Sequence, residues 1–471
     1  MNLETLSIAE ARRAFNAKDY SALDLTEAYL ARIAKMDGDI HAYLEVWADL
    51  ARAEARAADA LIARGEAQPL TGIPIAVKDN ILIEGRIASA ASKMLEKYVA
   101  SYDATVIAKL KAQGAVFLGR TNMDEFALGG STENSAFGPT KNPHDLARVP
   151  GGTSGGSAAA VAASMALVAL GSDTGGSIRQ PSAFCGVAGI KPTYGAVSRF
   201  GLIAAASSLD QIGAIGKTVA DAEALLAAIR GHDENDSTSI PDTPRSTKKP
   251  KTIGVPRDSL KQGIDPDVLK SFEQTLASLK ANGYTVVDIE LPTLAYALAV
   301  YYIINPAEVS TNLARFDGIR YGLSVDADTS IGVYEKSRAA GFGPETRRRV
   351  LLGTFVLSSG YADAYYRKAR AVREVIRRDF ARVFESVDAI ALPTSPVPAW
   401  KFGEKSDPLA MYAADIFTVP INLAGVPAIS VPSSAIKRDG NALPVGFQLI
   451  SAWGGEETLF KLAEDVEKRT V

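Results

Sequence analysis

The sequence predicts an α/β protein whose large β-sheet is covered by helices on both faces. Short apolar segments, typical of buried strands, alternate along the chain with longer amphipathic segments typical of helices. The 471 residues are 47% hydrophobic and 22% charged, which is ordinary for a globular protein and enough for a large core. No internal repeat is evident, and strands are expected on both sides of a polar connector. We therefore expect one domain over residues 1–471.

The first half of the chain is expected to begin with a helical region, residues 1–66. Ser21 and Asp24 form a capping-box pattern before one helix, and residues 48–66 are rich in Ala, Leu, Arg and Glu. A core of strands and helices follows over about residues 71–215. Its expected elements are a strand at 72–77, a helix at 103–115, a strand at 116–119, a helix from about Ser157 and a strand at 166–171.

The second half repeats the α/β pattern after a polar, proline-containing connector, residues 231–252, which we expect at the surface. Residues 293 to about 385 are expected to form an inserted helical layer, which includes the helical run 344–385. The other expected elements are strands at 253–256, 284–291, 388–394, 427–432 and 444–450, and helices at about 266–282 and 455–468.

Composition excludes several classes of function. The net charge of −3 and the pI of about 5.9 provide no basic field that would attract nucleic acid directly. Cys185 is the single cysteine, which excludes an intrachain disulfide and a cysteine-rich zinc site. The N-terminus lacks the apolar segment of a secretory signal, and the longest uncharged run, residues 149–172, is too rich in glycine and hydroxyls for a membrane span. We expect a cytoplasmic protein without metal or membrane contact.

Two glycine-hydroxyl clusters, GGTSGGS at 151–157 and TGGS at 174–177, are the most unusual local feature. Neither contains the lysine of a phosphate-binding P-loop, and the spacing of a dinucleotide-binding motif is absent. Ser177 follows an expected strand in a turn where the backbone N–H groups of residues 174–177 can converge on one oxygen. That arrangement is typical of a nucleophile with an oxyanion hole built from Thr174, Gly175, Gly176 and Ser177. An ordinary glycine turn at the end of a strand is the alternative.

A serine nucleophile requires a base. The three histidines, His41, His144 and His232, are expected at the surface, and the G-x-S-x-G motif of triad hydrolases is missing. Lys78 ends a strand that is apolar on both faces. Burial there would lower the pKa of its ammonium group and make it a base near neutral pH. An exposed lysine at a strand end is the other interpretation that the local sequence allows.

Three long motifs resemble the amidase signature family: GIPIAVKDN, GGTSGGSAAAVA and GSDTGGSIRQPSAFCGVAGIKPTYG. The resemblance covers essentially the whole chain and implies a large mixed sheet and a Ser–cis-Ser–Lys catalytic unit. Ser177 would be acylated, Lys78 would be the final base, and Thr153, after a cis peptide bond, would be the bridging hydroxyl. The family usually has serine at the position of Thr153. Threonine keeps the hydroxyl needed for a proton relay, and Ser154 is the alternative relay residue.

Further segments, such as 301–322 and 410–432, resemble the A subunits of tRNA-dependent amidotransferases, a branch of that family. This resemblance implies that glutamine is hydrolysed and that the ammonia passes to a B subunit, where ATP and Mg²⁺ are used and tRNA is bound. A small C subunit would complete a heterotrimer, and this chain would need no cofactor of its own. The implied glutamine-binding residues are Gly129 and Gly130 at the amide end, and Tyr301, Arg349 (or Arg348) and Asp415 at the amino-acid end.

Two other functions remain open at this stage. A stand-alone amidase acting on another small amide would share Lys78, Thr153 and Ser177 but would need neither Arg349 nor Asp415. A scaffold subunit with a decayed active site is the third possibility, for which Thr153 would be the symptom. Hydrolysis of other amides and trapping of an acyl-enzyme would separate these functions from a glutaminase.

Overall fold

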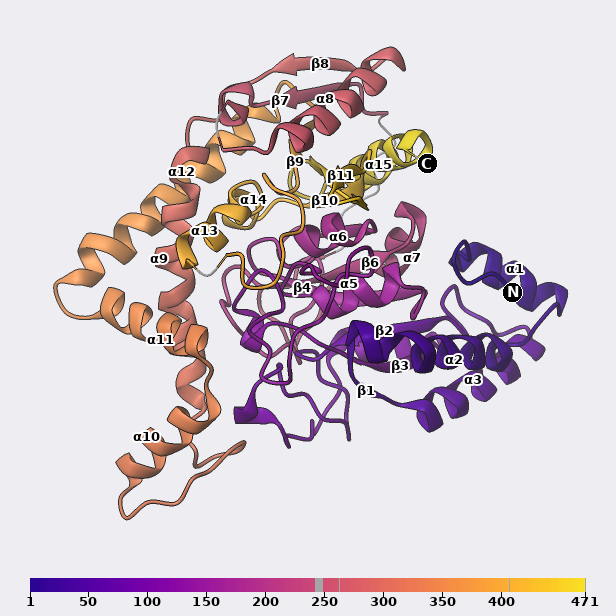
Figure 1. The fold of residues 1–471 in the computed structure, drawn as a ribbon, viewed down its shortest axis with the longest axis horizontal. Helices are drawn as coiled ribbons and strands as arrows, with labels where there is room; N and C mark the ends of the chain where they lie inside the picture. The colour runs from indigo at the N-terminus through magenta and orange to yellow at the C-terminus, as the bar shows by residue number, and fades with distance from the viewer. Residues whose placement is uncertain (242–248, 262, 406, 471) are drawn as a thin grey trace.

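The computed structural model describes residues 1–241, 249–261, 263–405 and 407–470. One mixed sheet of eleven strands runs through these residues in the order β1-β3-β2-β4-β6-β5-β10-β13-β9-β7-β8 (Figure 1). The strands are β1 (Tyr43–Val46), β2 (Pro74–Lys78), β3 (Val116–Thr121), β4 (Val168–Asp173), β5 (Ala188–Lys191), β6 (Gln211–Gly216), β7 (Thr252–Val255), β8 (Thr285–Asp288), β9 (Ala389–Pro393), β10 (Ala428–Pro432) and β13 (Gly446–Ile450). β11 (Ile436–Arg438) and β12 (Asn441–Leu443) form a separate hairpin.

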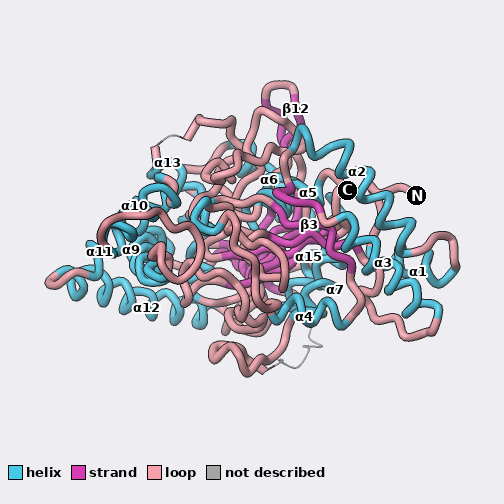
Figure 2. Tube along the Cα trace, turned by 90° about the horizontal axis from the view of Figure 1, so that it is seen from below, coloured by secondary structure: helices cyan, strands magenta, loops and turns pink. Residues whose placement is uncertain are grey.

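Helices cover both faces of the sheet, as expected. α5 (Gly155–Ala162) and α6 (Arg179–Cys185) lie on one face, and α7 (Val219–Ile229) and α15 (Glu456–Thr470) lie on the other (Figure 2). The remaining α-helices are α1 (Ile8–Ala17), α2 (Ala22–Ile40), α3 (Ala48–Ala63), α4 (Thr105–Ala112), α8 (Pro266–Ala281), α9 (Leu294–Asn312), α10 (Ser330–Gly341), α11 (Pro344–Leu357), α12 (Lys368–Val383), α13 (Pro408–Tyr412) and α14 (Val419–Ala424).

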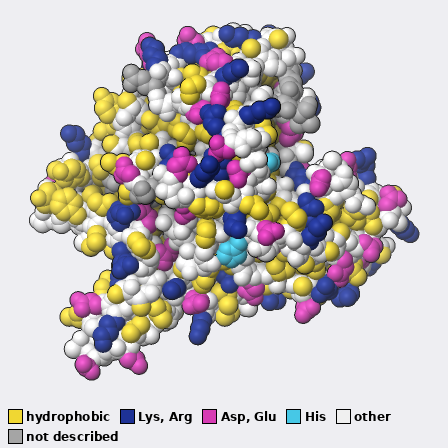
Figure 3. Space-filling model, in the orientation of Figure 1, with side chains coloured by type: hydrophobic (Ala, Val, Ile, Leu, Met, Phe, Trp, Pro, Cys, Tyr) yellow, Lys and Arg dark blue, Asp and Glu magenta, His cyan; other side chains and the backbone are white. Residues whose placement is uncertain are grey.

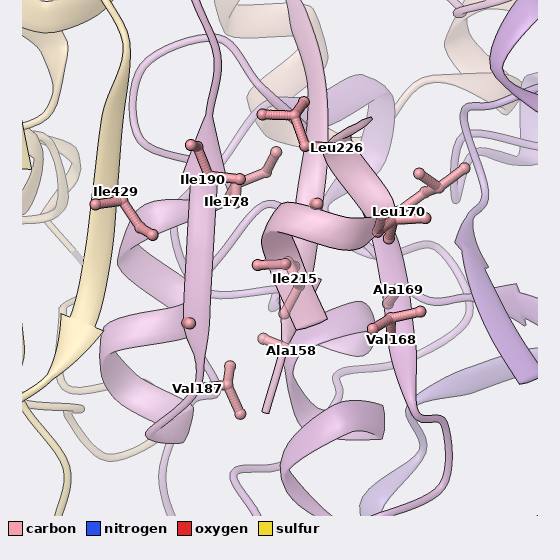
Figure 4. Close-up of a cluster of buried hydrophobic side chains, with 14 of the residues drawn as sticks. Ala158, Val168, Ala169, Leu170, Ile178, Val187, Ile190, Ile215, Leu226 and Ile429 are labelled. Atoms are coloured by element: carbon pink, nitrogen blue, oxygen red, sulfur yellow. The ribbon is translucent and has the colours of Figure 1, made fainter. Parts of the chain in front are cut away.

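The core is formed by apolar side chains between the sheet and these helices. Figure 4 shows how residues of β4, β5 and β6 meet Ala158 of α5 and Leu226 of α7. Alanine and glycine are frequent where α5 packs on the sheet. Glycine is required at Gly156, because an added Cβ would lie 2.5 Å from the carbonyl oxygen of Asn122. This close approach packs the first turn of α5 against the backbone that follows β3 and, at Ala42, against the backbone that precedes β1.

Most of the expected elements are confirmed, with boundary shifts of a few residues. The capping box of α2 is present, with Ser21 Oγ accepting a hydrogen bond from Asp24 N–H. The helical layer is also present, although the expected helical run 344–385 is interrupted after Leu357, where a π-helix (Ala362–Arg367) leads into α12. The N-terminal region is not purely helical, because β1 pairs antiparallel with β3. Residues 242–248 of the polar connector lie outside the described residues.

Candidate active site

Lys78 is the last residue of β2, and its amine lies among three hydroxyl groups. β2 and β4 are neighbouring parallel strands, so their carboxyl ends meet at one edge of the sheet. Lys78 Nζ lies 2.7 Å from Thr153 Oγ1, 2.8 Å from Ser154 Oγ and 2.9 Å from Ser172 Oγ. Because the side chain is fully buried, the strand-end lysine is not the exposed residue that the sequence also allowed.

The electrostatic environment favours the uncharged amine of Lys78. Burial lowers its pKa to about 7, since the ammonium form loses its hydration. Three buried carboxyl groups, those of Asp124, Asp173 and Asp210, oppose this shift without cancelling it. A substantial fraction of Lys78 is therefore uncharged near neutral pH, which is the state that can accept a proton.

Thr153 and Ser154, the two candidate relay residues, differ in how their hydroxyl groups are used. The Gly152–Thr153 peptide bond is cis, as the family resemblance implied. Ser154 Oγ donates to the carbonyl oxygen of Ser172 at 3.1 Å, and its backbone N–H donates to the carbonyl oxygen of Ser177. Thr153 Oγ1 accepts from Lys78 and, within the described residues, donates to no other group. If Lys78 is uncharged, its lone pair can accept the Thr153 proton across the same 2.7 Å contact, with Thr153 as the donor.

Ser177 lies in the turn between β4 and α6, which a buried ion pair holds in place. Asp173, the last residue of β4, pairs with Arg179 at 3.0 Å, and neither side chain is exposed. Asn422 of α14 donates to the same carboxylate at 2.9 Å. In the part of the chain that the structure describes, Ser177 Oγ makes no hydrogen bond, so the step from Ser177 to Thr153 remains a prediction. Hydrogen bonds of a catalytic nucleophile often tighten when substrate binds.

The oxyanion hole differs from the predicted set at one position. Gly176 N–H donates to Asp173 Oδ1 at 2.9 Å, and Ile178 N–H donates to Asp173 Oδ2 at 3.1 Å. Because the carboxylate at the end of β4 folds over the turn in this way, the Gly176 amide is satisfied within the protein and is not available to an oxyanion. Of the four predicted donors, the backbone amides of Thr174, Gly175 and Ser177 remain.

Close contacts explain why glycine occupies this turn. A Cβ added to Gly175 would lie 2.6 Å from Tyr301 Oη, and one added to Gly176 would lie 2.4 Å from Thr418 Oγ1. Thr418 Oγ1 donates to the carbonyl oxygen of Gly175 at 2.6 Å. The turn is thus packed between α9, which carries Tyr301, and the start of α14. This contact also places Tyr301 beside the predicted oxyanion hole.

Arg349 projects from α11 and is almost fully buried. Its Nε donates to Glu345 Oε1 at 2.7 Å and its Nη1 donates to Asn305 Oδ1 at 2.9 Å, while its guanidinium lies 4.7 Å from the ring centroids of Tyr302 and Tyr412. Arg348, the alternative carboxylate-binding residue, has a side chain that is 44% exposed and also pairs with Glu345. The structure favours Arg349, because only this guanidinium is fixed inside the protein.

Asp415 ends a short helical turn between α13 and α14 and lies near Arg349. Burial raises the pKa of Asp415 to about 8, although the Arg349 guanidinium opposes the shift. Gln180 Nε2 reaches Asp415 Oδ1 at 3.5 Å, and Gln180 Oε1 accepts from Gly152 N–H at 2.9 Å. Gln180, which sequence reasoning missed, thus connects the relay segment with the Asp415 end.

Gly129 and Gly130 lie on the loop that covers the relay segment. A Cβ added to Gly152 would lie 2.9 Å from the carbonyl carbon of Gly130, so the Gly130–Ser131 peptide touches the residue before Thr153. A Cβ on Gly130 itself would meet only Gln180 and Met411, at 3.6 and 3.9 Å. Gly129 packs against Asp124. The predicted amide-end residues therefore lie beside the relay.

The three histidines hydrogen-bond to groups other than Lys78, Thr153 and Ser177. The nearest partners of His41 and His144 are backbone carbonyls, and His232 contacts Ser239. In the described ranges, no group of three or more His, Cys, Asp or Glu side chains could hold a metal ion.

No helix among the described residues is long and apolar enough to cross a membrane.

Sequence reasoning also missed the residues that support the site, namely Ser172, Asp173, Arg179 and Thr418. Asp173 and Arg179 are the charged residues of the motif GSDTGGSIR. Two opposite charges that flank a glycine turn in an otherwise uncharged stretch are a recognisable signal for a buried pair. Ser172 and Thr418 give no comparable signal, because single hydroxyl residues occur throughout the chain.

Comparison with known proteins is consistent with this geometry. The family model described as Amidase matches residues 24–460. The chain is 51% identical over 473 residues to the A subunit of glutamyl-tRNA(Gln) amidotransferase from Microcystis aeruginosa, and the match covers 98% of this chain and 97% of that protein. It is 52% identical over 480 residues to the protein of the same name in Carboxydothermus hydrogenoformans, with coverage of 100% and 98%.

Solved structures show the same fold. The A subunit of glutamyl-tRNA(Gln) amidotransferase from Thermotoga maritima aligns with a TM-score of 0.82 and 41% identity over 100% of this chain and 96% of that one. The peptide amidase of Stenotrophomonas maltophilia aligns with a TM-score of 0.82 and 29% identity over 99% and 97%. The chain therefore belongs to the amidase family, which confirms the resemblance and the mixed α/β fold that it implied.

Proposed function

We propose that this chain is the glutamine-hydrolysing subunit of a tRNA-dependent amidotransferase. The observation that carries the proposal is the 2.7 Å contact between Lys78 Nζ and Thr153 Oγ1, in a fully buried setting beside the turn of Ser177. The relatives at 51% and 52% identity, which are named for such a subunit, support the choice of glutamine as substrate. The ammonia would serve the amidation of Glu-tRNA(Gln), of Asp-tRNA(Asn) or of both.

The proposed reaction begins with proton transfer through the relay. Uncharged Lys78 accepts the Thr153 proton while Thr153 accepts the Ser177 proton. Ser177 Oγ then forms a bond to the side-chain carbonyl carbon of glutamine, and the electron pair of the C=O bond moves to oxygen. The backbone amides of Thr174, Gly175 and Ser177 stabilise that oxyanion.

The tetrahedral intermediate then breaks down, and the proton moves back through the relay in the opposite direction. The oxyanion re-forms the carbonyl group, the C–N bond breaks, and the nitrogen receives a proton from Lys78 through Thr153, so that ammonia leaves. Water, deprotonated by the same relay, attacks the acyl-enzyme ester, and breakage of its C–O bond releases glutamate and restores the Ser177 hydroxyl.

The amino-acid end of glutamine carries both charges of a zwitterion, and the pocket offers the complementary pair. Arg349 is the proposed partner of the carboxylate, because Glu345 and Asn305 fix its guanidinium through Nε and Nη1, and Nη2 can donate to a carboxylate. Asp415 is the proposed partner of the ammonium group, whose charge would favour the ionised carboxylate. Tyr301, with its hydroxyl beside Gly175, would separate this end from the reacting amide.

The partners in this proposal are a B subunit together with a small C subunit, in a cytoplasmic heterotrimer. ATP and Mg²⁺ would be used, and tRNA would be bound, by the B subunit, which agrees with the net charge of −3 of this chain. No cofactor is required in the reaction described above. Co-purification of the native protein and identification of the accompanying chains would test these partners.

Glutamine hydrolysis by the purified protein is the central experiment, read out as released ammonia together with mass spectrometry of the acyl-enzyme. We expect an adduct on Ser177 that is absent in Ser177→Ala, and at least a tenfold higher KM in Asp415→Asn with little change in folding. Hydrolysis of aryl or aliphatic amides without glutaminase activity would favour a stand-alone amidase. A protein that forms no acyl-enzyme with any amide would be a scaffold.

Two matched variants test the relay residue. Thr153→Val removes the hydroxyl while keeping the shape of the side chain, and we expect it to reduce kcat by about a hundredfold or more. Ser154→Ala removes the neighbouring hydroxyl, and the smaller loss expected there reflects only a less well-oriented Lys78. A larger loss in Ser154→Ala than in Thr153→Val would assign the relay to Ser154.

A further inference from the structure

Glu125 is a buried carboxylate that the reaction described above does not use. It follows β3 and is 2% exposed. Its Oε1 accepts a hydrogen bond from Ser92 Oγ at 2.5 Å, and its Oε2 accepts from Gly343 N–H at 2.8 Å and from Thr346 Oγ1 at 2.5 Å. A buried carboxylate is retained only where such donors surround it, so these three contacts fix its position.

On one side, Glu125 belongs to the loop that borders the reacting amide. The preceding residue, Asp124, accepts hydrogen bonds from the backbone N–H groups of Thr132 at 2.8 Å and Asn134 at 3.1 Å, and this bond pattern shapes the loop that carries Gly130. The two residues after Glu125, Phe126 and Ala127, have φ angles of 50° and 60°. Because side-chain-bearing residues rarely adopt that region, the surrounding contacts must hold this backbone in place.

On the other side, Glu125 contacts the first turn of α11. Gly343 is the N-cap of that helix, and a Cβ there would lie 2.6 Å from Glu125 Oε2. A carboxylate at a helix N-terminus satisfies a free N–H group and interacts favourably with the helix dipole. On the same helix, Glu345 holds Arg349, and Glu345 also accepts from Tyr412 Oη at 2.8 Å.

We propose that Glu125 is a positioning residue that fixes the distance between the scissile-amide end of the site and the carboxylate-binding Arg349. It joins the amide-side loop to the helix that carries Arg349, so its length determines where the amino-acid end of glutamine is held. The inference rests on the proposed function, because it assigns Arg349 to the glutamine carboxylate. It predicts that substrate binding depends on the length of residue 125 more than on its charge.

Two variants of Glu125 separate the effect of side-chain length on substrate binding from the effect of side-chain charge. Glu125→Gln keeps the length, and its amide oxygen can still accept from Gly343 and Thr346 while its NH₂ group donates to Ser92 Oγ. Glu125→Asp keeps the charge but withdraws the carboxylate by one methylene. In glutamine hydrolysis by the full chain with any co-purifying subunits, we expect Glu125→Asp to raise KM at least about tenfold and to change kcat less than about threefold. Glu125→Gln should stay within about threefold of wild type in both constants.

Thr346→Val tests the same contact independently. It removes the α11 hydroxyl that donates to Glu125 without changing the size of the side chain. We expect the same rise in KM in weaker form, about threefold, and this variant decides the question if Glu125→Asp does not fold. An unchanged KM in active Glu125→Asp, or a loss confined to kcat, would overturn the inference alone. Absence of glutamine hydrolysis in the wild-type protein would overturn the proposed function, and this inference with it.

Discussion

At the scale of single residues, the burial of Lys78 is what makes the site chemically competent. The apolar strand before Lys78 allowed burial as one of two interpretations, and the structure shows that Lys78 is fully buried. The ring of hydroxyls around it was only partly predictable. Thr153 and Ser154 are in the glycine cluster, whereas Ser172 lies in β4 and meets Lys78 only because β2 and β4 are neighbours. Long-range strand pairing of this kind leaves no mark in the local sequence.

The pH dependence of catalysis is a direct consequence of the Lys78 environment. Because burial lowers the pKa of Lys78 to about 7, the amine loses its proton as the pH rises through that value. The active form is the uncharged one, so kcat for glutamine should rise up to about tenfold per pH unit below 7 and level off above it. Steady-state rates at saturating glutamine between about pH 5.5 and 8.5 would measure this. A rate that falls over this interval contradicts Lys78 as the base.

At the scale of elements, the strands that lead to the candidate catalytic residues Lys78 and Ser177 were the easier ones to predict. β2 and β4 are short apolar runs that end at glycine or polar residues, and the sequence predicted both within about two residues. β1, β5 and β6 were not predicted. β5 and β6 lie among glycine-rich turns where an apolar run of four to six residues has no distinctive period, and β1 is an edge strand between two helices. Their existence depends on neighbours far away in sequence.

In the turn between β4 and α6, the local sequence determines the backbone turn, whereas tertiary packing determines which backbone amides stay free. The glycines correctly indicated a tight turn, which lies between β4 and α6. They did not indicate that Asp173 would occupy the Gly176 amide, because that contact depends on how Arg179 and Asn422 orient the carboxylate. The predicted set of oxyanion donors therefore changes at Gly176, while Ser177 as the nucleophile stays a prediction.

Gly175→Ala tests this turn as an element. The added Cβ would lie 2.6 Å from Tyr301 Oη and 2.7 Å from Tyr301 Cζ, and Tyr301 is buried and cannot easily move away. The turn would have to shift, which misplaces the oxyanion donors, and we expect kcat to fall about a hundredfold or more. Gly38→Ala is the matched control, since no atom lies within 4 Å of its added Cβ. Near wild-type kcat in Gly175→Ala would show that the Gly175 amide is not an oxyanion donor.

At the scale of the whole molecule, the two halves of the sequence contribute to one sheet. β9, β10 and β13 follow the helical layer in sequence, yet β10 pairs with β5 of the first half, so the helical layer is inserted between strands of the same sheet. That insertion brings Tyr301 of α9 against Gly175, in the turn that follows β4, and Arg349 of α11 near Asp415. It explains why residues more than two hundred positions apart lie close together, and why only the family resemblance predicted the amino-acid end of the site.

The helical layer also exposes an apolar patch, which is visible at the left edge of the molecule (Figure 3). Large apolar side chains on α11 and the π-helix are exposed there, namely Leu351, Leu352, Phe355, Leu357, Tyr361 and Tyr365. Leu351 is 71% exposed and Phe355 is 48% exposed, four residues apart on the same face of α11. Contiguous exposed apolar surface of this kind is typical of protein–protein contacts, and we expect it to contact another subunit of the proposed heterotrimer.

Replacing both residues tests this surface. Because the patch lies on the outer side of α11, Leu351→Glu combined with Phe355→Glu should leave the Ser177 acyl-enzyme intact. The burial of two carboxylates in an apolar interface would be strongly unfavourable, so we expect recovery of co-purifying subunits to fall at least about tenfold. Ile331→Glu is the control, since Ile331 is a 69% exposed apolar residue on α10, outside the patch. Unchanged recovery of the subunits in the double variant, or an equal loss in Ile331→Glu, would show that the patch is not the contact surface.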